Sequence, residues 1–365
     1  MKASEFKKLA VILLIAAAHI TPGNAGQEAA KKYEKLFQLT ARGSLEIENR
    51  YGSIDIRNWD RDEISVDVIV KVTHSDRETA ERQLSFITIN FSQRDNSVKV
   101  VTEIDKRISR RRTRLFSSDI DGQSISIDYT VYAPKESDFR ITHRYGDIFI
   151  DEATGHTFID LRYGNLQANR IMRDNTRPLS EINLAYSPKA TVSSADWLQV
   201  NMRYSDLFVE QCRALVVTSS YSKLRVERAN SIVTEARYSD FNLGQITNFV
   251  AESSYTNYTI NKIGRILDVE SRYGNVRVDN VPAGFSKIRF VSSYGNMRAG
   301  IDADANYSIE ATASYGSVNI PSGAKVNRIT SGTQTTISGI VGDDLQPSSR
   351  VDITTRYGNV NLTPR

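Results

Sequence analysis

The chain has a single cysteine, Cys212, among its 365 residues. One thiol excludes an intramolecular disulfide, and a thiol so far from the N-terminus excludes a lipid anchor attached beside a leader peptide. A chain of this length without disulfides must be held together by its apolar core and its backbone hydrogen bonds.

Histidine is also scarce, with four residues. They are scattered, and they have neither the spacing of metal ligands nor that of a catalytic triad. The sequence also lacks a phosphate-binding loop, a zinc signature and a nucleophile elbow. These absences favour a protein that is not an enzyme and that uses no cofactor or metal. The histidines are His19, His74, His143 and His156.

There is no large excess of charge of either sign. The formal net charge is +4, and removal of the first 25 residues would take away three lysines and one glutamate. The remaining net charge of about +2 argues against a general polyanion binder, so we expect no nucleic-acid partner.

Residues 1–25 have the pattern of a secretory signal peptide. Three lysines precede an apolar stretch over 9–18, and small residues at 23–25 provide a cleavage site. The apolar stretch is too short to span a bilayer, and no later stretch is long enough. We therefore expect an exported chain without a transmembrane segment, located in the periplasm or on the cell surface.

A tyrosine-centred signature, often Arg-Tyr-Gly-Asn or Ser-Tyr-Gly-Asn, recurs twelve times. From Tyr145 onward the copies are 17 to 23 residues apart, except for a last gap of 42. A fixed period near 20 is typical of stacked structural units. Because 42 is twice 21, we expect one unit around Thr336 to have lost its tyrosine. The signature tyrosines are Tyr51, Tyr145, Tyr163, Tyr186, Tyr204, Tyr221, Tyr238, Tyr255, Tyr273, Tyr294, Tyr315 and Tyr357.

Apolar and polar residues alternate on both sides of each signature, which predicts a strand, a corner and a second strand. Helical periodicity is absent from these repeats. Stacked coils of this kind form a parallel β-helix, and the usual handedness of crossovers favours a right-handed one. We therefore expect an all-β fold in which residues 136–365 form about 11 or 12 coils.

Residues 36–135 are expected to form a small, mostly β capping domain with one short helix over 75–84, where Ser75 and Asp76 are capping residues. Between its strands lies a basic cluster of three arginines. We interpret this cluster as a solvated hairpin loop, because no aromatic residues are interleaved for stacking on bases. The alternative is a site for acidic polysaccharide, lipid headgroups or nucleic acid. The cluster is Arg110, Arg111 and Arg112.

By the alternation, each signature tyrosine lies on the same side as the apolar positions two and four residues before it. We therefore expect the tyrosines from Tyr145 to Tyr357 to point inward or into the corner and to form an internal ladder of stacked rings, and we favour this over an aromatic surface for sugars. The glycine that often follows suits a corner with a positive φ or a close approach. The Asn or Asp after it is typical of turns, and we favour that role over calcium binding.

The residue before each tyrosine should then face outward. From Arg203 to Ser293 it alternates between arginine and serine, which separates like charges on neighbouring coils. We interpret this alternation as structural. The alternative is a weak surface for an anionic glycan at Arg203, Arg237 and Arg272.

Polysaccharide lyases and hydrolases are also found among parallel β-helices, so an enzyme is the main alternative. The coils leave few loop residues for a cleft, and the longest excess is at 171–181. A carbohydrate-active enzyme would use a side groove near 143–185. Loss of turnover on substitution of His143 or Arg173 would support this alternative. A third hypothesis is a periplasmic sensor or assembly partner that binds through the last coil, whose edge at 359–362 we expect to be unpaired.

The leader, the opening LEIENRYGSIDIRNWDRDEISV and the repeats resemble the bacterial putative-adhesin family of exported β-helical repeat proteins, which carry a domain of unknown function. The resemblance covers about residues 36–365 and implies a β-helical fold with an adhesive role, without catalytic residues. We expect a non-enzymatic envelope protein, adhesin-like binding module or scaffold, whose partner is a glycan or an envelope protein.

Overall fold

The computed structural model describes residues 26–40, 42–105 and 124–365. The chain divides into two compact units, one ending at Gly164 and one spanning Asn165–Arg365. The signal peptide expected over 1–25 and the basic cluster Arg110, Arg111 and Arg112 lie outside the described residues. A separate capping domain ending at residue 135 stays a prediction.

The first unit is almost entirely β. The one helix among its described residues follows Asp76, whose carboxylate accepts a hydrogen bond of 2.8 Å from the backbone N–H of Thr79, as expected of an N-cap residue. The elements are β1 Gln27–Gln38, β2 Ser44–Arg50, β3 Ile54–Asn58, β4 Glu63–His74, α1 Arg77–Leu84, β5 Ile87–Arg94, β6 Ser97–Ile104, β7 Ser124–Ala133, β8 Asp138–Arg144, β9 Ile148–Ala153 and β10 Thr157–Arg162.

The strands of the first unit combine antiparallel hairpins with parallel pairs. Strands β1, β4 and β7 are antiparallel neighbours, as are β5 and β6. The parallel pairs begin at β2, which lies between β6 and β8, and at β3, which lies between β7 and β9. The corner at Tyr51 between β2 and β3 is therefore already part of a parallel stack.

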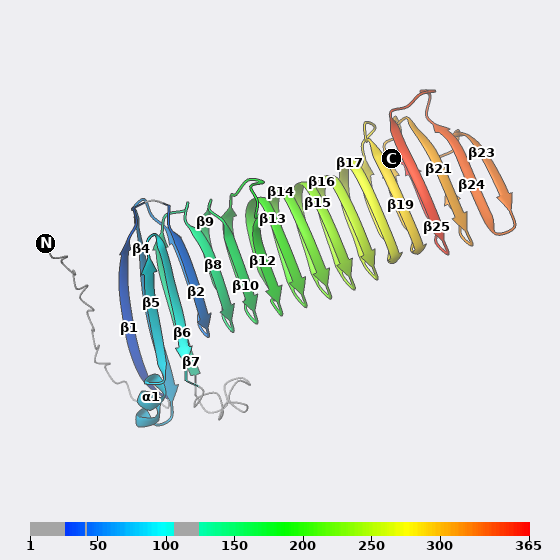
Figure 1. Cartoon of the computed structure of the whole chain (residues 1–365). Helices are drawn as coiled ribbons and strands as arrows, with labels where there is room; N and C mark the ends of the chain where they lie inside the picture. Colours follow the sequence, from blue (N-terminus) through cyan, green and yellow to red (C-terminus); the bar gives the residue numbers. More distant parts are fainter. Residues whose placement is uncertain (1–25, 41, 106–123) are drawn as a thin grey trace. The chain divides into compact units, whose positions relative to one another are not determined.

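The second unit is a solenoid-like stack of parallel strands (Figure 1). Its strands are β11 Leu166–Ile171, β12 Ser180–Ala185, β13 Ala190–Arg203, β14 Asp206–Ser220, β15 Lys223–Arg237, β16 Asp240–Ser254, β17 Asn257–Tyr273, β18 Val276–Val281, β19 Lys287–Tyr294, β20 Met297–Ile301, β21 Tyr307–Ser314, β22 Val318–Asn319, β23 Lys325–Ser331, β24 Gln334–Val341, β25 Ser349–Arg356 and β26 Val360–Pro364.

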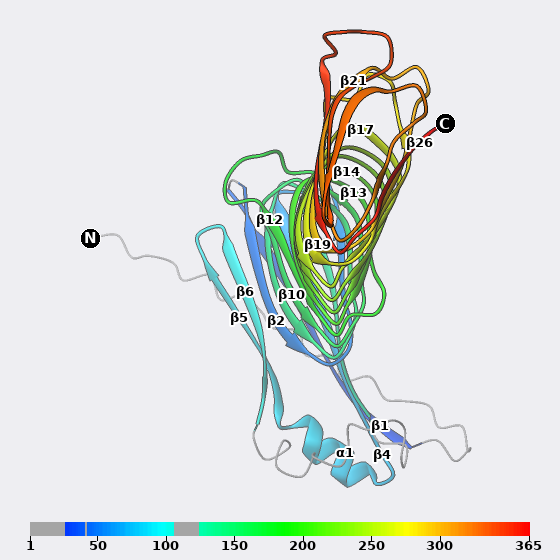
Figure 2. The ribbon, with the colours of Figure 1, turned by 90° about the vertical axis from the view of Figure 1, so that its right-hand side faces the viewer.

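Each long strand of this unit contributes to two sheets. In β14 the burial alternation shifts at Glu210–Gln211 and again at Ala214–Leu215, so the strand bends between its halves. We call the sheet that follows each tyrosine the post-tyrosine sheet and the one that precedes it the pre-tyrosine sheet. Figure 2, which looks along the stack, shows the coils of this unit as flattened loops. The bend forms a second corner, away from the tyrosines.

The core between the two sheets is built from columns, each formed by residues at the same position on successive rungs. One column on the pre-tyrosine sheet is aliphatic or aromatic on every rung, and all its members are buried. Burial of each such side chain stabilises the fold by about 1.5–3 kcal/mol. The column is Leu198, Leu215, Ile232, Phe249, Leu267, Ile288, Val351 and Ile309.

The order of residues in this column shows that the last strands do not stack in the order in which they follow one another along the chain. Strand β25 lies between β19 and β21, and β26 lies between β20 and β22. The expected coil around Thr336 does not exist, because residues 325–341 form an antiparallel hairpin, β23 and β24, on the edge of β21. The expected unpaired edge at 359–362 is also wrong, since β26 has a neighbour on each side. The C-terminal coil is an internal rung.

Candidate functional site

The signature tyrosines of the second unit form a continuous stack of rings. Successive centroids are 4.5–5.2 Å apart, and the ring planes are within 16° of parallel. Tyr51, Tyr145 and Tyr163 stack in the same way in the first unit. In spatial order, the ladder of the second unit is Tyr186, Tyr204, Tyr221, Tyr238, Tyr255, Tyr273, Tyr294, Tyr357 and Tyr315.

The expected inward orientation of these rings is wrong. Apart from Tyr273, which is half-buried, their exposed fractions reach from 41% at Tyr204 to 57% at Tyr315. Most have a positive φ, such as 51° at Tyr238, and a left-handed residue breaks the alternation that places side chains on the two faces of a strand. The tyrosine itself is therefore the corner residue, and its ring points out of the solenoid.

The stack leaves little aromatic surface for a ligand. Each internal ring is stacked between two neighbouring rings at centroid distances of 4.5–5.2 Å, so neighbouring rings cover its two faces. A sugar that stacks needs a free ring face, which makes the ladder a poor sugar platform. Its contribution is the contact between offset aromatic rings on successive rungs.

Replacement of a central ring tests this role. Tyr238→Asn tolerates the positive φ but removes the stacking, and we expect it to lower the free energy of unfolding by about 1–3 kcal/mol. Tyr238→Phe keeps the ring and should stay within about 0.5 kcal/mol of the parent. Urea unfolding measures both. Equal losses in the two variants would show that the hydroxyl group, rather than the ring, stabilises the corner.

The arginines expected as a weak ligand surface do lie in one row beside the ladder. Arg203 and Arg237 are separated by Ser220 on the intervening rung. The guanidinium of Arg203 lies 5.4 Å from the ring centroid of Tyr204, and that of Arg272 lies 5.9 Å from the ring centroid of Tyr273. These cations thus pack on neighbouring rings, and the row lies along a corner of the coil.

The asparagines after the corner form a hydrogen-bonded ladder of their own. The side-chain oxygen of Asn257 accepts from the backbone N–H of Asn275 at 3.0 Å, and that of Asn275 accepts from Asn296 at 3.1 Å. Asn296 accepts from Asn359 at 2.9 Å. Their oxygens therefore hold successive rungs together. Within residues 26–40, 42–105 and 124–365, no group of three or more acidic, His or Cys side chains is placed to hold a metal ion.

A groove of about 650 Å³ runs along the second corner across β13–β17. One wall is a single column, with one residue from each of five successive strands. The floor is formed by small apolar residues, including Ala195, Cys212 and Ala229. We call this feature the second-corner groove. The wall column is Ser194, Gln211, Arg228, Gln245 and Lys262.

The opposite wall of the second-corner groove is also polar. It carries Asp196, Arg213, Asn230 and Thr247, one from each of the four strands β13–β16. Arg213 forms an ion pair with Asp196 at 3.4 Å. Burial raises the pKa of the Cys212 thiol to about 12, so the thiol on the floor is neutral at physiological pH and a poor nucleophile.

Sequence reasoning missed this groove, although a signal was present. The five wall residues are spaced by 17 positions, from Ser194 to Lys262. Aligning the repeats on the tyrosine would have placed four of them in one column, seven residues after the tyrosine, with Ser194 eight residues after Tyr186. The column lines a hollow because each long strand bends in its middle. The alternation around the tyrosine does not reveal this bend.

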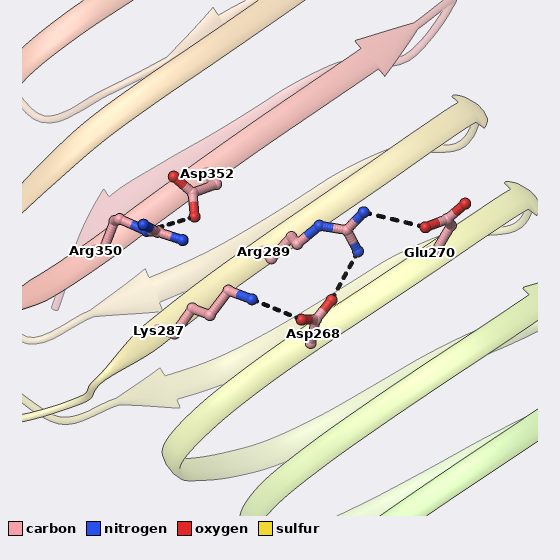
Figure 3. A network of polar contacts seen from close by, with 6 residues as sticks. All are labelled: Asp268, Glu270, Lys287, Arg289, Arg350 and Asp352. Atoms are coloured by element: carbon pink, nitrogen blue, oxygen red, sulfur yellow. Dashed lines mark hydrogen bonds and ion pairs between the residues drawn. The ribbon is translucent and has the colours of Figure 1, made fainter.

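A second hollow, of about 500 Å³, lies on the outer face of the pre-tyrosine sheet. Its centre is a column of valines in which Val233 and Val250 are exposed. The same column continues into an ion-pair network (Figure 3). There Asp268 accepts from Lys287 at 2.8 Å and from Arg289 at 2.9 Å.

The network in Figure 3 is internally neutralised. Arg289 also donates to Glu270 at 3.1 Å, and Arg350 pairs with Asp352 at 2.7 Å. Burial disfavours the charged form of Asp268, but the hydrogen bonds from Lys287 and Arg289 outweigh it and hold the pKa of this carboxyl below its usual value. Asp268 is therefore a structural carboxylate.

His143 is fully buried in the first unit. Its Nε2 lies 3.0 Å from the carbonyl oxygen of Gly52 and donates to it. Arg173 belongs to the second unit, where its carbonyl accepts from the backbone N–H of Trp197 at 3.2 Å. The hypothesis of an enzymatic groove near 143–185 therefore loses its histidine, which has no access to substrate.

His143 should make the protein sensitive to mild acid. Burial lowers its pKa below the usual value of 6.5, against the hydrogen bond to Gly52 and the charges of Asp147 and Asp128. The unfolded chain then binds more protons than the folded chain, so stability is complete above pH 6.5 and falls as pH decreases toward the folded pKa. Denaturant midpoints measured across this range test it, and His143→Gln should remove this part of the slope.

No helix among the described residues is long and apolar enough to cross a membrane. Taken together, the fold and the grooves define an all-β solenoid-like protein with polar surfaces and stacked side-chain ladders.

A family model described as Toastrack DUF4097 matches residues 43–363, and the chain belongs to this family. A search of curated proteins found no match.

The solved structures that resemble the chain share little sequence with it. A "putative adhesin" from Parabacteroides distasonis has 10% identity and a TM-score of 0.31, and the match covers 93% of this chain and 98% of that one. A "putative adhesin" from Bacteroides fragilis has 10% identity and a TM-score of 0.27, with 91% and 97% covered. A "putative cell adhesion protein" from Clostridium sporogenes has 11% identity and a TM-score of 0.20, with 92% and 100% covered. At these values the likeness supports no statement about function.

Proposed function

We propose that this chain is an exported, non-enzymatic protein of the bacterial cell envelope that acts as an adhesin-like binding module or scaffold. The observation that carries the proposal is the second-corner groove. It offers amides, hydroxyls and cations along five rungs, and Asp196 is the one carboxylate among the described residues that line it. Glycoside hydrolysis normally uses a pair of carboxyl groups, so this groove is suited to binding rather than to that reaction.

The adhesive role follows from the sequence resemblance, and export follows from the signal-peptide pattern of residues 1–25. The periplasm and the cell surface are both compatible with that pattern. The proposal includes a right-handed winding and about 11 or 12 coils, as favoured by crossover handedness and repeat length. A rigid stack of this kind presents a surface whose chemistry repeats with every rung.

Cell fractionation and a turnover assay test the proposal. The full chain should be found in the envelope or outside the cell, and a variant lacking residues 1–25 should stay in the cytoplasm. Purified mature protein should release no reducing sugar from a panel of acidic and neutral polysaccharides. A cytoplasmic full chain, or sustained sugar release, would overturn the proposal.

A further inference from the structure

The wall column of the second-corner groove alternates between amides and cations. Gln211, Arg228, Gln245 and Lys262 follow one another in register on β14, β15, β16 and β17. Neighbouring strands are about 4.8 Å apart, so the two cations stand about 10 Å apart. A polymer that matches this column must have units about as long as the rung spacing of about 4.8 Å. It must also carry an anionic group on every second unit.

The alternation alone has a structural explanation, because like charges on adjacent rungs repel. Two further observations point to a ligand. The column lines one side of the second-corner groove, which is open to solvent. Arg228 approaches Glu210 only to 4.0 Å, and Lys262 forms no ion pair with any described residue.

The charge in the groove favours an anion. Its lining carries Arg213, Arg228 and Lys262 against the single carboxylate of Asp196, which Arg213 already engages. Glu210 and Glu227 stand outside the lining, where Glu227 is held by Arg225 at 2.5 Å. A cationic ligand would meet Lys262, which has no ion pair with a described residue, and Arg228, whose carboxylate partner Glu210 lies 4.0 Å away.

The remaining lining favours a sugar polymer over a nucleic acid. Asn230, Gln245 and Thr247 supply donors and acceptors suited to hydroxyl and acetamido groups. No aromatic side chain is among the described residues that line the groove, whereas single-stranded nucleic acids are held by stacking on aromatic rings. The rung spacing is also comparable to the length of one pyranose unit in an extended glycan.

We infer that the second-corner groove binds an extended acidic polysaccharide in which a uronic acid alternates with a neutral sugar. In this arrangement the carboxylates of the uronic acids meet Arg228 and Lys262, and the neutral sugars meet Gln211 and Gln245. Arg213 faces the chain from the opposite wall. The inference rests on the proposed binding function and names its ligand class and site.

Fluorescence polarisation with a labelled hyaluronan oligosaccharide, an alternating uronate copolymer, tests the inference on the mature chain. The double variant Arg228→Gln/Lys262→Gln should lower the affinity about tenfold or more, because each cation makes a charge-assisted contact. The matched control Arg203→Gln/Arg237→Gln makes the same charge change in the row beside the tyrosines and should stay within about twofold. Thermal unfolding of both variants verifies that the fold is intact.

Each other outcome has a defined meaning. Equal losses in the two double variants would show general charge attraction and overturn the groove as the site. Equal binding of a single-stranded DNA oligonucleotide, or of neutral dextran, would overturn the ligand class. Absence of hyaluronan binding would overturn the inference, while envelope fractionation without turnover would leave the proposed function standing.

Discussion

Gly146→Ala is expected to prevent the first unit from folding stably. A Cβ at this position would lie 1.6 Å from the carbonyl oxygen of Gly52 and 2.7 Å from Nε2 of His143. Neither neighbour can move easily, since Gly52 belongs to the adjacent corner and His143 is fully buried. Relief requires separation of two rungs, so we expect a loss of about 3 kcal/mol or more, measured by urea unfolding.

Gly284→Ala is the matched control. No atom lies within 4 Å of a Cβ built there, so the change should stay within about 0.5 kcal/mol of the parent. If Gly146→Ala unfolds at the same urea concentration as the parent, the close approach between the corners does not exist.

The sequence suggested two reasons for the glycine after the tyrosine, a positive φ or a close approach of the backbone. The positive φ belongs to the tyrosine at most corners. Glycine is needed because successive corners approach closely: a Cβ on Gly295 would lie 2.0 Å from the carbonyl oxygen of Gly274.

Serine corners solve the same packing problem in a different way, and they occur together. The hydroxyl of Ser205 donates to the carbonyl of Arg203 at 2.9 Å and accepts from the backbone N–H of Ser187 at 3.1 Å. Ser222 repeats this pattern on the next rung. A hydroxyl thus bridges two rungs where a glycine would let them touch. The sequence shows both residue types at the corner but does not show the distance between rungs that selects them.

Much of the fold could be predicted from local patterns. Alternation identified the strands, the spacing of 17 to 23 residues between signatures identified the stack, and Asp76 marked the start of α1. Alternation failed at the tyrosines because a left-handed residue changes the face to which a side chain points. The second-corner groove was missed for a related reason, since its hollow depends on the bend near Cys212.

The order of the last coils was also predicted incorrectly, although the sequence held a clue. The Arg/Ser alternation before the tyrosine breaks in sequence order, where Ser314 follows Ser293. In the structure the rung of Arg356 lies between them, and the alternation is restored. In the second unit the alternation that separates these like charges therefore follows the spatial order of the coils rather than their order along the chain. The first unit does not follow it, since Arg50, Arg144 and Arg162 are partners on adjacent rungs.

Engineered disulfides test this interleaved order directly. In a Cys212→Ser background, Val291→Cys/Thr354→Cys should oxidise readily, because these residues are partners on the neighbouring strands β19 and β25. Val291→Cys/Thr312→Cys should not, because β25 lies between them and two rungs are about 10 Å apart, beyond the reach of a disulfide. Free-thiol titration and the mass loss of two hydrogens distinguish the pairs.

The reverse result, a disulfide only in the second pair, would place β21 directly on β19 and contradict the interleaving. Oxidation of the first pair would support the interleaved order. The C-terminal strand β25 then lies on an internal rung, between β19 and β21, which precede it in the sequence. The rungs of β21 and β22 then cannot be fully paired until residues 349–364 are in place. The last coil is therefore what joins the β23–β24 hairpin and its neighbour β21 to the rest of the stack.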